Sequence, residues 1–552
     1  MHKFEKVNLH GRRHVFPAGV SLPDLDAELR KNNTYVGRPR DLRYLIYPPL
    51  VRFISPYINH DADMPESSSP VQYLFPDLPA SETGRLSLES TALKGKVLYP
   101  DTIAYHTSVE SYYFIDARLE PTCIVQPETA DDVALAVSTL TASDRRQRCQ
   151  FAIRSGGHTC WPGAANIEKG VTIDLTHMNS TTFHQENYTV SILPGARWAS
   201  VYKTLHPLGV MVTGGRASSV GVGGITLGGG NSFFASRYGF VCDSVVVLAN
   251  GEIINANNQT NPDLFRALKG GSNNFGIVTK FDFAAFESHE LWGGVIVHDK
   301  STTAQQIPAI VNFTNHVARD PYASLITSWH YSSSRGVSIV SNILDHTEPI
   351  EQVSIFNQVL VIPRVSSSIR LTNLHDLTEE LELPRGLRSR FLTLTFKNDP
   401  RMIQKAVDLH DRSIEMAKAR ARTREWTFTT FFQPLPKLFS QHSVVRGGNI
   451  LGLDRFDENL LLFLIVLSWQ GTEDGTLFDS LGKAAIQDLD AYAREIGADN
   501  EFIYLNYADP SQNSLRSYGE ENLAEIHRVA EKYDPEHIFQ YQVPGGFKVS
   551  KA

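Results

Sequence analysis

The stretch RSGGHTCWPG, residues 154–163, follows directly on the apolar run CQFAI at 149–153. The run has the composition of a buried β-strand, and two glycines and a histidine stand at its end. Glycine has no Cβ, so it adopts positive φ without strain and lets backbone N–H groups approach an anion closely. The stretch therefore predicts a tight turn that is suited to holding a phosphate group.

A second glycine-rich segment, GGRASSVGVGGITLGGGNSFFASRYG, covers residues 214–239 and holds nine glycines in 26 positions. It is too apolar for a flexible linker, so we expect it to be ordered. Two such loops in one domain favour a ligand with a diphosphate, such as a dinucleotide, over a mononucleotide. Neither the P-loop pattern nor the Rossmann pattern between a first strand and helix is present. A tightly turned β domain without a phosphate ligand is the alternative.

The composition is that of a globular protein with more than one domain. The chain has 552 residues, and this length is too great for one compact core. Its residues are 42% hydrophobic and 20% charged, an ordinary balance for a globular protein. The formal net charge of −8, without a long run of Lys or Arg, gives no electrostatic reason to expect a nucleic acid or an anionic membrane as partner. No run of about 18 apolar residues predicts a membrane span, and we see no signal peptide at the N-terminus.

The four cysteines leave the cellular compartment open. Their spacing matches neither a zinc site nor a redox motif, so we expect no metal. Cys123 and Cys149 stand on either side of one predicted helix, each beside a strand-like run, a layout that would allow a disulfide. Such a bridge would fit a secretory route. Glycosylation triplets would also fit a secretory route, although such triplets arise by chance as well. They stand at Asn32, Asn179, Asn187, Asn258 and Asn312.

The pattern along the chain predicts an α+β fold. Residues 1–92 are mixed in character, and a Pro/Ser-rich part at 61–84 indicates a linker or a loose surface arm. From Leu119 short strand and helix patterns alternate, and Asn250-Gly251 predicts the turn of a hairpin. After about Glu287 strands such as GGVIVH mix with helices and indicate a second domain. The clearest amphipathic helices cover residues 476–497 and 520–533.

Five segments, in register along the chain, resemble the berberine bridge enzyme-like flavoproteins. These oxidoreductases have a PCMH-type FAD-binding domain on the vanillyl-alcohol oxidase fold. The resemblance runs from about Leu98 to Gly546, is vague between about 290 and 490, and is closest to fungal members, many of which act in secondary-metabolite biosynthesis. The segments are PTCIVQPETADDVALAV (121–137), FAIRSGGHTCWPGAANIEKGVTIDL (151–175), VGVGGITLGGGNSFFASRYGFVCDSV (220–245), GSNNFGIVTKFDF (271–283) and YLNYADPSQNSLRSYGEENLAEIHRVAEKYDPEHIFQYQVPGG (504–546).

The resemblance also implies a domain organisation. After an N-terminal extension and linker at 1–92, we expect the FAD-binding domain at 98–288. A substrate-binding domain with an antiparallel sheet and helices would follow at 289–500. A C-terminal segment at 501–547 would return to the FAD-binding domain and complete the flavin site.

The resemblance gives the opening stretch a specific role. It implies that backbone N–H groups of residues 155–157 wrap the FAD diphosphate, and that the imidazole of His158 is joined to the flavin 8α-methyl carbon. Neutral imidazole is a good nucleophile, and a covalent bond fixes the flavin ring. A loop histidine that caps a turn is the alternative. The cofactor-binding residues implied in this way are His158, Arg154, Ser155, Gly156, Gly157, Val220, Gly223, Gly224, Gly228, Gly229, Val278 and Asn506.

The sequence departs from the resemblance at one position. Members with a second, cysteinyl flavin link place that cysteine where this chain has Ala217, so we expect one covalent link at most. Val220, three residues on, matches a gatekeeper position at which a small side chain leaves room for O2 beside the flavin. Valine there favours an oxidase, and a plain buried strand valine is the alternative.

Tyr507, in the segment YLNYAD, aligns with a tyrosine that acts as base in several members. A phenol is a weak base and needs neighbouring donors or cations that stabilise the phenolate. A buried tyrosine that satisfies a backbone group is the alternative. We predict an extended strand here, which would turn Leu505 and Tyr507 to one face, and Asn506 to the other unless a bulge intervenes.

The expected function is that of an FAD-linked oxidoreductase, an oxidase that takes two electrons from a small organic substrate and passes them to O2. Carbohydrate oxidases would use the same scaffold with a more open, aromatic-lined cleft. A flavin-scaffolded oxidative cyclase would also fit the resemblance, and so would a flavin-binding protein without enzymatic activity. Fold analogy cannot choose among substrates.

Overall fold

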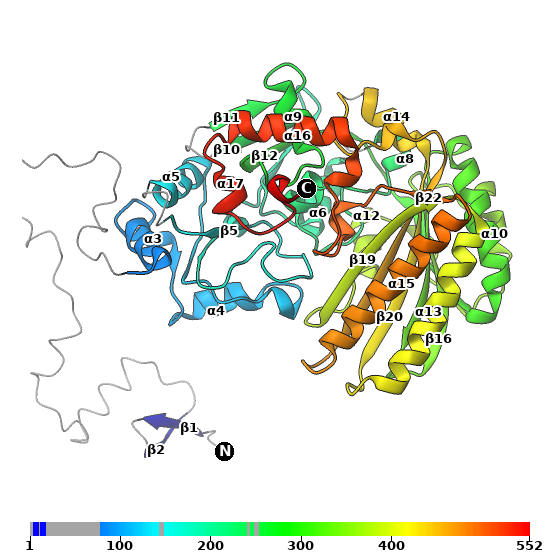
Figure 1. The fold of residues 1–552 in the computed structure, drawn as a ribbon, viewed down its shortest axis with the longest axis horizontal. Helices are drawn as coiled ribbons and strands as arrows, with labels where there is room; N and C mark the ends of the chain where they lie inside the picture. Colours follow the sequence, from blue (N-terminus) through cyan, green and yellow to red (C-terminus); the bar gives the residue numbers. More distant parts are fainter. Residues whose placement is uncertain are drawn as a thin grey trace, which may run out of the picture. The chain divides into compact units, whose positions relative to one another are not determined.

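The computed structural model describes residues 4–9, 12–17, 78–142, 148–239, 243–247, 253–445 and 447–552, with backbone alone at 4–9, 12–17, 243–247 and 445. The chain divides into two compact units, Met1–Glu66 and Ser67–Ala552. In the first unit, strand β1 (Phe4–Leu9) pairs antiparallel with β2 (Arg12–Pro17). The second unit carries everything that follows (Figure 1). Most of the expected linker at 61–84 lies outside the described residues.

The second unit begins with a small sheet covered by two helices. Its central strands are parallel, because β4 and β5 both pair in parallel with β6, which lies between them. Helix α5 begins at a capping box in which the side chains of Thr129 and Asp132 each accept a backbone N–H of the other residue. In sheet order the strands are β3 (Val97–Leu98), β4 (Cys123–Val125), β6 (Val171–Asp174) and β5 (Phe151–Arg154), and the helices are α3 (Ala80–Glu89) and α5 (Ala130–Thr141).

Helix α3 extends the folded unit toward the N-terminus. It lies within the 1–92 segment expected to be an extension and linker, yet it packs against α5. Its Leu88 is fully buried in the core under the small sheet. Residues 80–89 are therefore part of the folded unit.

A five-stranded antiparallel sheet and short helices complete the first half of this unit. Strands β10 and β11 form the hairpin expected around Asn250-Gly251, although that turn itself lies outside the described residues. The strands, in sheet order, are β11 (Ile253–Ala256), β10 (Asp243–Val247), β12 (Ile277–Ala284), β8 (Thr189–Ile192) and β7 (Thr181–His184). The helices are α4 (Ile103–Glu110), α6 (Trp198–Leu205), α7 (Val222–Leu227), α8 (Ala235–Tyr238) and α9 (Pro262–Leu268).

The second half is built on a nine-stranded sheet. Its order is β17-β14-β16-β15-β20-β21-β19-β22, with β18 paired to β14. The strands are β14 (Leu291–Asp299), β15 (Ala323–Ser332), β16 (Val337–His346), β17 (Ser366–Ser367), β18 (Arg370–Thr372), β19 (Arg388–Lys397), β20 (Trp426–Leu435), β21 (Leu460–Trp469) and β22 (Asp499–Asn500). The α-helices there are α10 (Thr303–His316), α11 (Asn357–Leu360), α12 (Leu374–Glu380), α13 (Pro400–Arg420), α14 (Lys437–Val445) and α15 (Gly475–Glu495). A short pair, β9 (Val210–Met211) with β13 (Phe286–Glu287), lies before this sheet in the chain.

Strand β21 is buried on both faces, against helices on one side of the sheet and beside a cavity on the other. All ten of its residues, LLLFLIVLSW, are buried. Side chains alternate between the faces of a strand. Residues 461, 463, 465 and 467 accordingly pack against the helices α10, α13 and α15, which cover one face (Figure 1). Leu464 and Val466 line a cavity on the opposite face.

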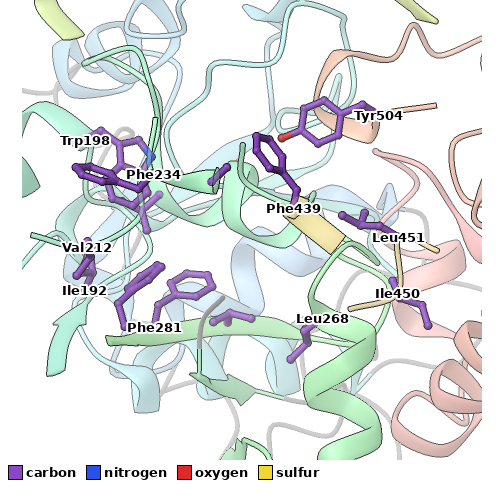
Figure 2. Close-up of a cluster of buried hydrophobic side chains, with 14 of the residues drawn as sticks. Ile192, Trp198, Val212, Phe234, Leu268, Phe281, Phe439, Ile450, Leu451 and Tyr504 are labelled. Carbon is purple, nitrogen blue, oxygen red and sulfur yellow. The ribbon is translucent and has the colours of Figure 1, made fainter. Parts of the chain in front are cut away.

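The C-terminal segment returns to the first half of the unit, and this confirms the expected α+β arrangement. Helix α16 (Glu520–Tyr533) packs against α9, and an ion pair joins Arg266 to Glu525. After α17 (Ile538–Tyr541), the Gln542 carbonyl accepts the backbone N–H of Phe151 in β5. Figure 2 shows the shared apolar core, where Phe281 of β12 and Trp198 of α6 lie in one cluster with Ile450, Leu451 and Tyr504.

The disulfide that the sequence layout would allow between Cys123 and Cys149 is absent, and both residues are free, buried cysteines. The reason is the strand order. Strand β6 lies between β4 and β5, so Cys123 and Phe151 both pair with Val171 from opposite sides. Two strand spacings amount to about 10 Å, which exceeds the Cα separation that a disulfide spans. Among the described residues no helix is long and apolar enough to cross a membrane.

The two glycine-rich loops meet at a backbone contact that admits no side chain. A Cβ on Gly156 would lie 2.5 Å from the Gly221 Cα, and neither backbone can move aside as a flexible side chain would. We expect Gly156→Ala to destabilise the protein by about 1–3 kcal/mol, the usual effect of overpacking. Gly95→Ala is the matched control, because a Cβ there meets nothing within 4 Å. Thermal melting measures both variants, and equal midpoints would contradict the tight contact.

Candidate functional site

A cavity of about 370 Å³ lies where the two halves of the second unit meet. One wall is the stretch Ser155–Trp161 after β5, together with parts of the segment 216–231. The opposite wall is the face of the nine-stranded sheet that its helices leave uncovered. Residues 504–508 and 546–547 of the C-terminal segment close the remaining side.

The loop at 155–157 is held by contacts with the turn before helix α6 and with the second glycine-rich segment. Ser155 Oγ donates to the Pro194 carbonyl at 2.5 Å and accepts the Gly223 N–H at 3.1 Å. Gly157 has a φ of 62°, and Gly156 lies against Gly221. Without Cβ atoms at these positions, backbone polar groups border the cavity directly, as a cradle for a diphosphate requires.

Arg154 lies behind this loop and does not line the cavity. Its guanidinium is buried, lies 3.4 Å from the Asp174 carboxylate, and stacks 4.0 Å from the centre of the Tyr112 ring. It also donates to the Ser108 carbonyl at 2.8 Å. The structure thus gives Arg154, expected to bind the cofactor, a role in fixing the base of the loop.

His158 faces the cavity from the end of the loop. Its Nε2 lies 3.1 Å from Ser219 Oγ, and its ring lies 4.1 Å from the ring of Tyr113 and 5.6 Å from that of Phe114. Burial lowers the pKa of His158 to about 4, and the Arg197 charge acts in the same direction against an opposing contribution from Glu382. The imidazole is therefore neutral at pH 7, the form in which it is a nucleophile.

The other expected cofactor residues divide into two groups. Val220, Gly223, Gly224, Val278 and Asn506 line the cavity, as does Ala217. Gly228 and Gly229 lie behind the lining. A Cβ on Gly228 would meet the Asn506 side chain at 2.0 Å, and one on Gly229 would meet Leu451 and Tyr504 at 3.2 Å. These two glycines make room for the C-terminal segment and do not border the cavity.

The expected strand at YLNYAD is wrong, because residues Leu505–Tyr507 form a single 3₁₀ turn. Successive side chains on such a turn are about 120° apart, whereas strand neighbours point in opposite directions. Asn506 and Tyr507 can therefore both reach the cavity without a bulge, and both line it. Asn506 Nδ2 donates to the Ile225 carbonyl at 2.9 Å and to Tyr504 Oη at 3.1 Å.

Two residues that the sequence interpretation did not single out bind the hydroxyl of Tyr507. Arg216 Nη2 donates to Tyr507 Oη at 2.8 Å, and Tyr507 Oη donates to Gln433 Oε1 at 3.3 Å. Arg216 also donates to Gln433 Oε1, so the three side chains form one cluster. Arg216 comes from the second glycine-rich segment, where no local sequence pattern marks it as a partner of Tyr507. Gln433 is the one amide side chain in strand β20, whose other residues are threonine or apolar, a signal that could have marked it.

The sheet wall beyond this cluster is apolar. Its side chains come from five neighbouring strands of the large sheet and are Ile326, Ile343, Phe391, Phe431, Leu464 and Val466. Tyr507, Arg216 and Gln433 thus place a polar group at one edge of an apolar chamber.

The residues present fit FAD. The glycine cradle suits its diphosphate, the neutral His158 faces the same cavity, and apolar side chains such as Val220, Val278 and Phe547 suit a flat ring system. Among the described residues no group of three or more His, Cys, Asp or Glu could hold a metal ion.

Comparison with known proteins agrees with this assignment. A model of the FAD binding domain family matches residues 121–257. FAD-dependent monooxygenase sdcF of Emericella nidulans is 44% identical over 469 residues, which cover 84% of this chain and 98% of that protein.

Solved structures show the same fold at low identity. Physcomitrella patens BBE-like 1 superposes with a TM-score of 0.68 at 19% identity, covering 83% of this chain and 98% of its own. Glucooligosaccharide oxidase from Acremonium strictum, which carries a 6-S-cysteinyl, 8α-N1-histidyl FAD, gives a TM-score of 0.64 at 19% identity and covers 84% and 98%. The chain is an FAD-dependent oxidoreductase that belongs to the fungal FAD-dependent monooxygenases, and its fold is that of the berberine bridge enzyme-like flavoproteins.

Proposed function

We propose that the protein is an FAD-linked oxidase that takes two electrons from a small, largely apolar organic molecule and passes them to O2. The observation that carries the proposal is the cluster at Tyr507. A phenol that accepts a hydrogen bond from a guanidinium borders a cavity shared by the glycine cradle and an apolar sheet face.

Tyr507 is the catalytic base in this proposal. The Arg216 cation, 2.8 Å from Tyr507 Oη, stabilises the negative charge of a phenolate. Gln433 fixes the direction of the phenolic oxygen. Tyr507 accepts the O–H or N–H proton of the substrate while hydride leaves the neighbouring carbon. FAD, when bound, supplies the acceptor for that hydride.

The apolar wall supports an apolar substrate over a carbohydrate. Sugar hydroxyls need hydrogen-bond partners, and burying them without partners costs about 1–3 kcal/mol each. Ile326, Leu464 and Val466 offer none. Glucooligosaccharide oxidase has the same fold, so fold alone does not decide this point.

O2 as electron acceptor rests on Val220, which lines the cavity and is partly exposed within it. The names of the relatives suggest a second candidate, insertion of an oxygen atom into the substrate. The two reactions differ in their products. An oxidase yields one H2O2 for each substrate oxidised and needs no nicotinamide cofactor, whereas a monooxygenase transfers an atom of ¹⁸O2 to the product. A cyclase without turnover of the flavin yields neither.

A substrate screen tests the reaction class. Purified holoenzyme is incubated without air with aromatic and aliphatic alcohols, with metabolite extracts of the source organism, and with oligosaccharides. We expect the flavin absorbance to bleach with a member of the first two groups, and H2O2 to form when air is admitted. Bleaching by oligosaccharides alone would contradict the apolar substrate class.

We expect the flavin to stay with the acid-precipitated protein through a single bond to His158. The neutral imidazole faces the cavity, and Ala217 offers no second attachment point. His158→Ala should release all of its flavin on denaturation, as measured by flavin fluorescence of the supernatant and the pellet. Ala217→Cys should allow a second bond. Complete release of flavin from the wild type would refute the covalent link.

Tyr507→Phe should lower the rate of anaerobic flavin reduction by roughly 10²–10⁴, the range usual for loss of a general base. The substitution keeps the ring and removes the oxygen that Arg216 and Gln433 bind, so FAD content should persist. Stopped-flow absorbance with a substrate from the screen measures the rate. An unchanged rate across the pH range would place the base elsewhere.

Val220→Leu should slow reoxidation of the reduced flavin by air and leave anaerobic reduction nearly intact, because the larger side chain fills space beside the ring. Stopped-flow measurement of each half-reaction separates the two effects. Equal slowing of both would indicate a displaced flavin and rule out the gatekeeper role.

A further inference from the structure

A carboxylate from the second half of the unit lies behind His158 without lining the cavity. Glu382 follows helix α12 and is half-buried. Its carboxylate accepts hydrogen bonds from Ser219 Oγ at 2.5 Å, from the Ser219 N–H at 2.6 Å, from Ser218 Oγ at 2.8 Å and from Tyr113 Oη at 3.0 Å. Ser219 supplies two of these donors through its hydroxyl and its backbone, whereas Tyr113 shares its one hydroxyl proton with the Leu383 carbonyl.

These donors keep Glu382 ionised. Burial raises the pKa of its carboxyl, but the hydrogen bonds from Ser219, Ser218 and Tyr113 outweigh burial and hold the pKa below its usual value. Ser219 also has a cationic partner, because the Arg197 guanidinium donates to the Ser219 carbonyl. Arg197 and Arg385 both add positive charge around His158, and Glu382 opposes them.

The direction of these hydrogen bonds decides which ring nitrogen of His158 carries the hydrogen. A serine hydroxyl has one proton, and Ser219 donates it to the Glu382 carboxylate. Ser219 Oγ, 3.1 Å from His158 Nε2, therefore has only a lone pair available for this contact and acts as its acceptor. The Ser219 contact therefore favours the hydrogen on Nε2, and in that neutral tautomer the nucleophilic lone pair is on Nδ1.

We propose that Glu382, acting through Ser219, is the positioning residue that holds His158 as the Nε2–H tautomer and so directs flavin attachment to Nδ1. The inference rests on the proposed histidyl link. A carboxylate that orients a histidine through its second nitrogen is a common arrangement behind metal-binding histidines, and here the same arrangement would serve a carbon–nitrogen bond.

Attachment of the flavin to His158 would be a two-electron oxidation of the 8α-methyl group. A bond forms between Nδ1 and the 8α-carbon, and one C–H bond of that carbon breaks. The electron pair of that C–H bond passes through the ring system to O2, the acceptor of the proposed oxidase. O2 also takes up two protons and leaves as H2O2. One proton comes from the methyl group. The other leaves Nε2 through Ser219 to the Glu382 carboxylate, which releases it for uptake by the reduced oxygen and is ionised again.

Ser219→Ala and Ser218→Ala form a matched pair for the test. Both remove a hydroxyl that donates to Glu382, but only Ser219 contacts His158. The proteins are produced with little covalent flavin in riboflavin-limited cells and then incubated with FAD in air. The acid-precipitable flavin is measured over time. The histidyl-flavin is then released by digestion, and its substituted nitrogen is identified by NMR.

We expect Ser219→Ala to slow attachment on the order of tenfold to a hundredfold, the effect usual when the outer partner of a ligating histidine is lost. Glu382→Gln should slow it similarly, while Ser219→Thr, which keeps the hydroxyl, should restore it and Ser218→Ala should attach near the wild-type rate. The link should be at Nδ1 in the wild type. Non-covalent FAD content and melting temperature identify any variant that fails to fold.

Two outcomes overturn the inference alone: equal attachment rates in Ser219→Ala and Ser218→Ala with covalent flavin in the wild type, or a wild-type link at Nε2. A wild type that releases all its flavin on denaturation refutes the histidyl link itself, and the inference with it.

Discussion

The site depends on one close contact between two backbones. Gly156, at the end of strand β5, and Gly221, at the start of helix α7, approach so closely that a Cβ on either would lie 2.5 Å from the other backbone. This contact brings the RSGGH loop against the second glycine-rich segment. Ser155 and His158 of the first loop then border the same cavity as Val220 of the second segment, although the two lie more than 60 residues apart in the chain. Glycine is needed here for close approach, since no positive φ is involved at either position.

The chemistry of the cavity is divided between the two halves of the unit. The first half supplies the glycine cradle and the Arg216 cation, and the large sheet supplies Gln433 and an apolar wall. Tyr507 comes from the C-terminal segment, which lies between them. A phenol would be a poor base against the apolar wall alone, because burial disfavours its charged form. Its position at the polar edge of the chamber places the Tyr507 hydroxyl, which accepts a hydrogen bond from Arg216, beside an apolar surface.

The sequence predicted the α+β class, the hairpin at Asn250-Gly251 and the helices near the C-terminus, because these depend on local patterns. It did not predict Arg216 and Gln433 as partners of Tyr507. Arg216 is 217 residues from Gln433 in the sequence, and Gln433 is 74 residues from Tyr507, so only the tertiary fold brings them together. The 3₁₀ turn at Leu505–Tyr507 was missed because its three residues read equally well as a strand. The disulfide considered between Cys123 and Cys149 does not form because strand β6 lies between β4 and β5. The positions of the two cysteines in the sequence do not reveal this strand order.

The position of Glu382 adds an order of events to the proposed attachment. His158 belongs to the first half of the unit, but Glu382 follows α12 in the second, and the Thr378 carbonyl of that helix accepts the Ser218 N–H. The hydrogen-bond chain from Glu382 to His158 exists only when α12 is docked on the glycine-rich segment. While α12 is undocked, Glu382 makes no hydrogen bond to Ser219, and this hydrogen-bond chain does not select the tautomer of His158. Within the proposal, covalent attachment therefore follows docking of the two halves, and the bond forms in a cavity that is already closed by its substrate-binding wall.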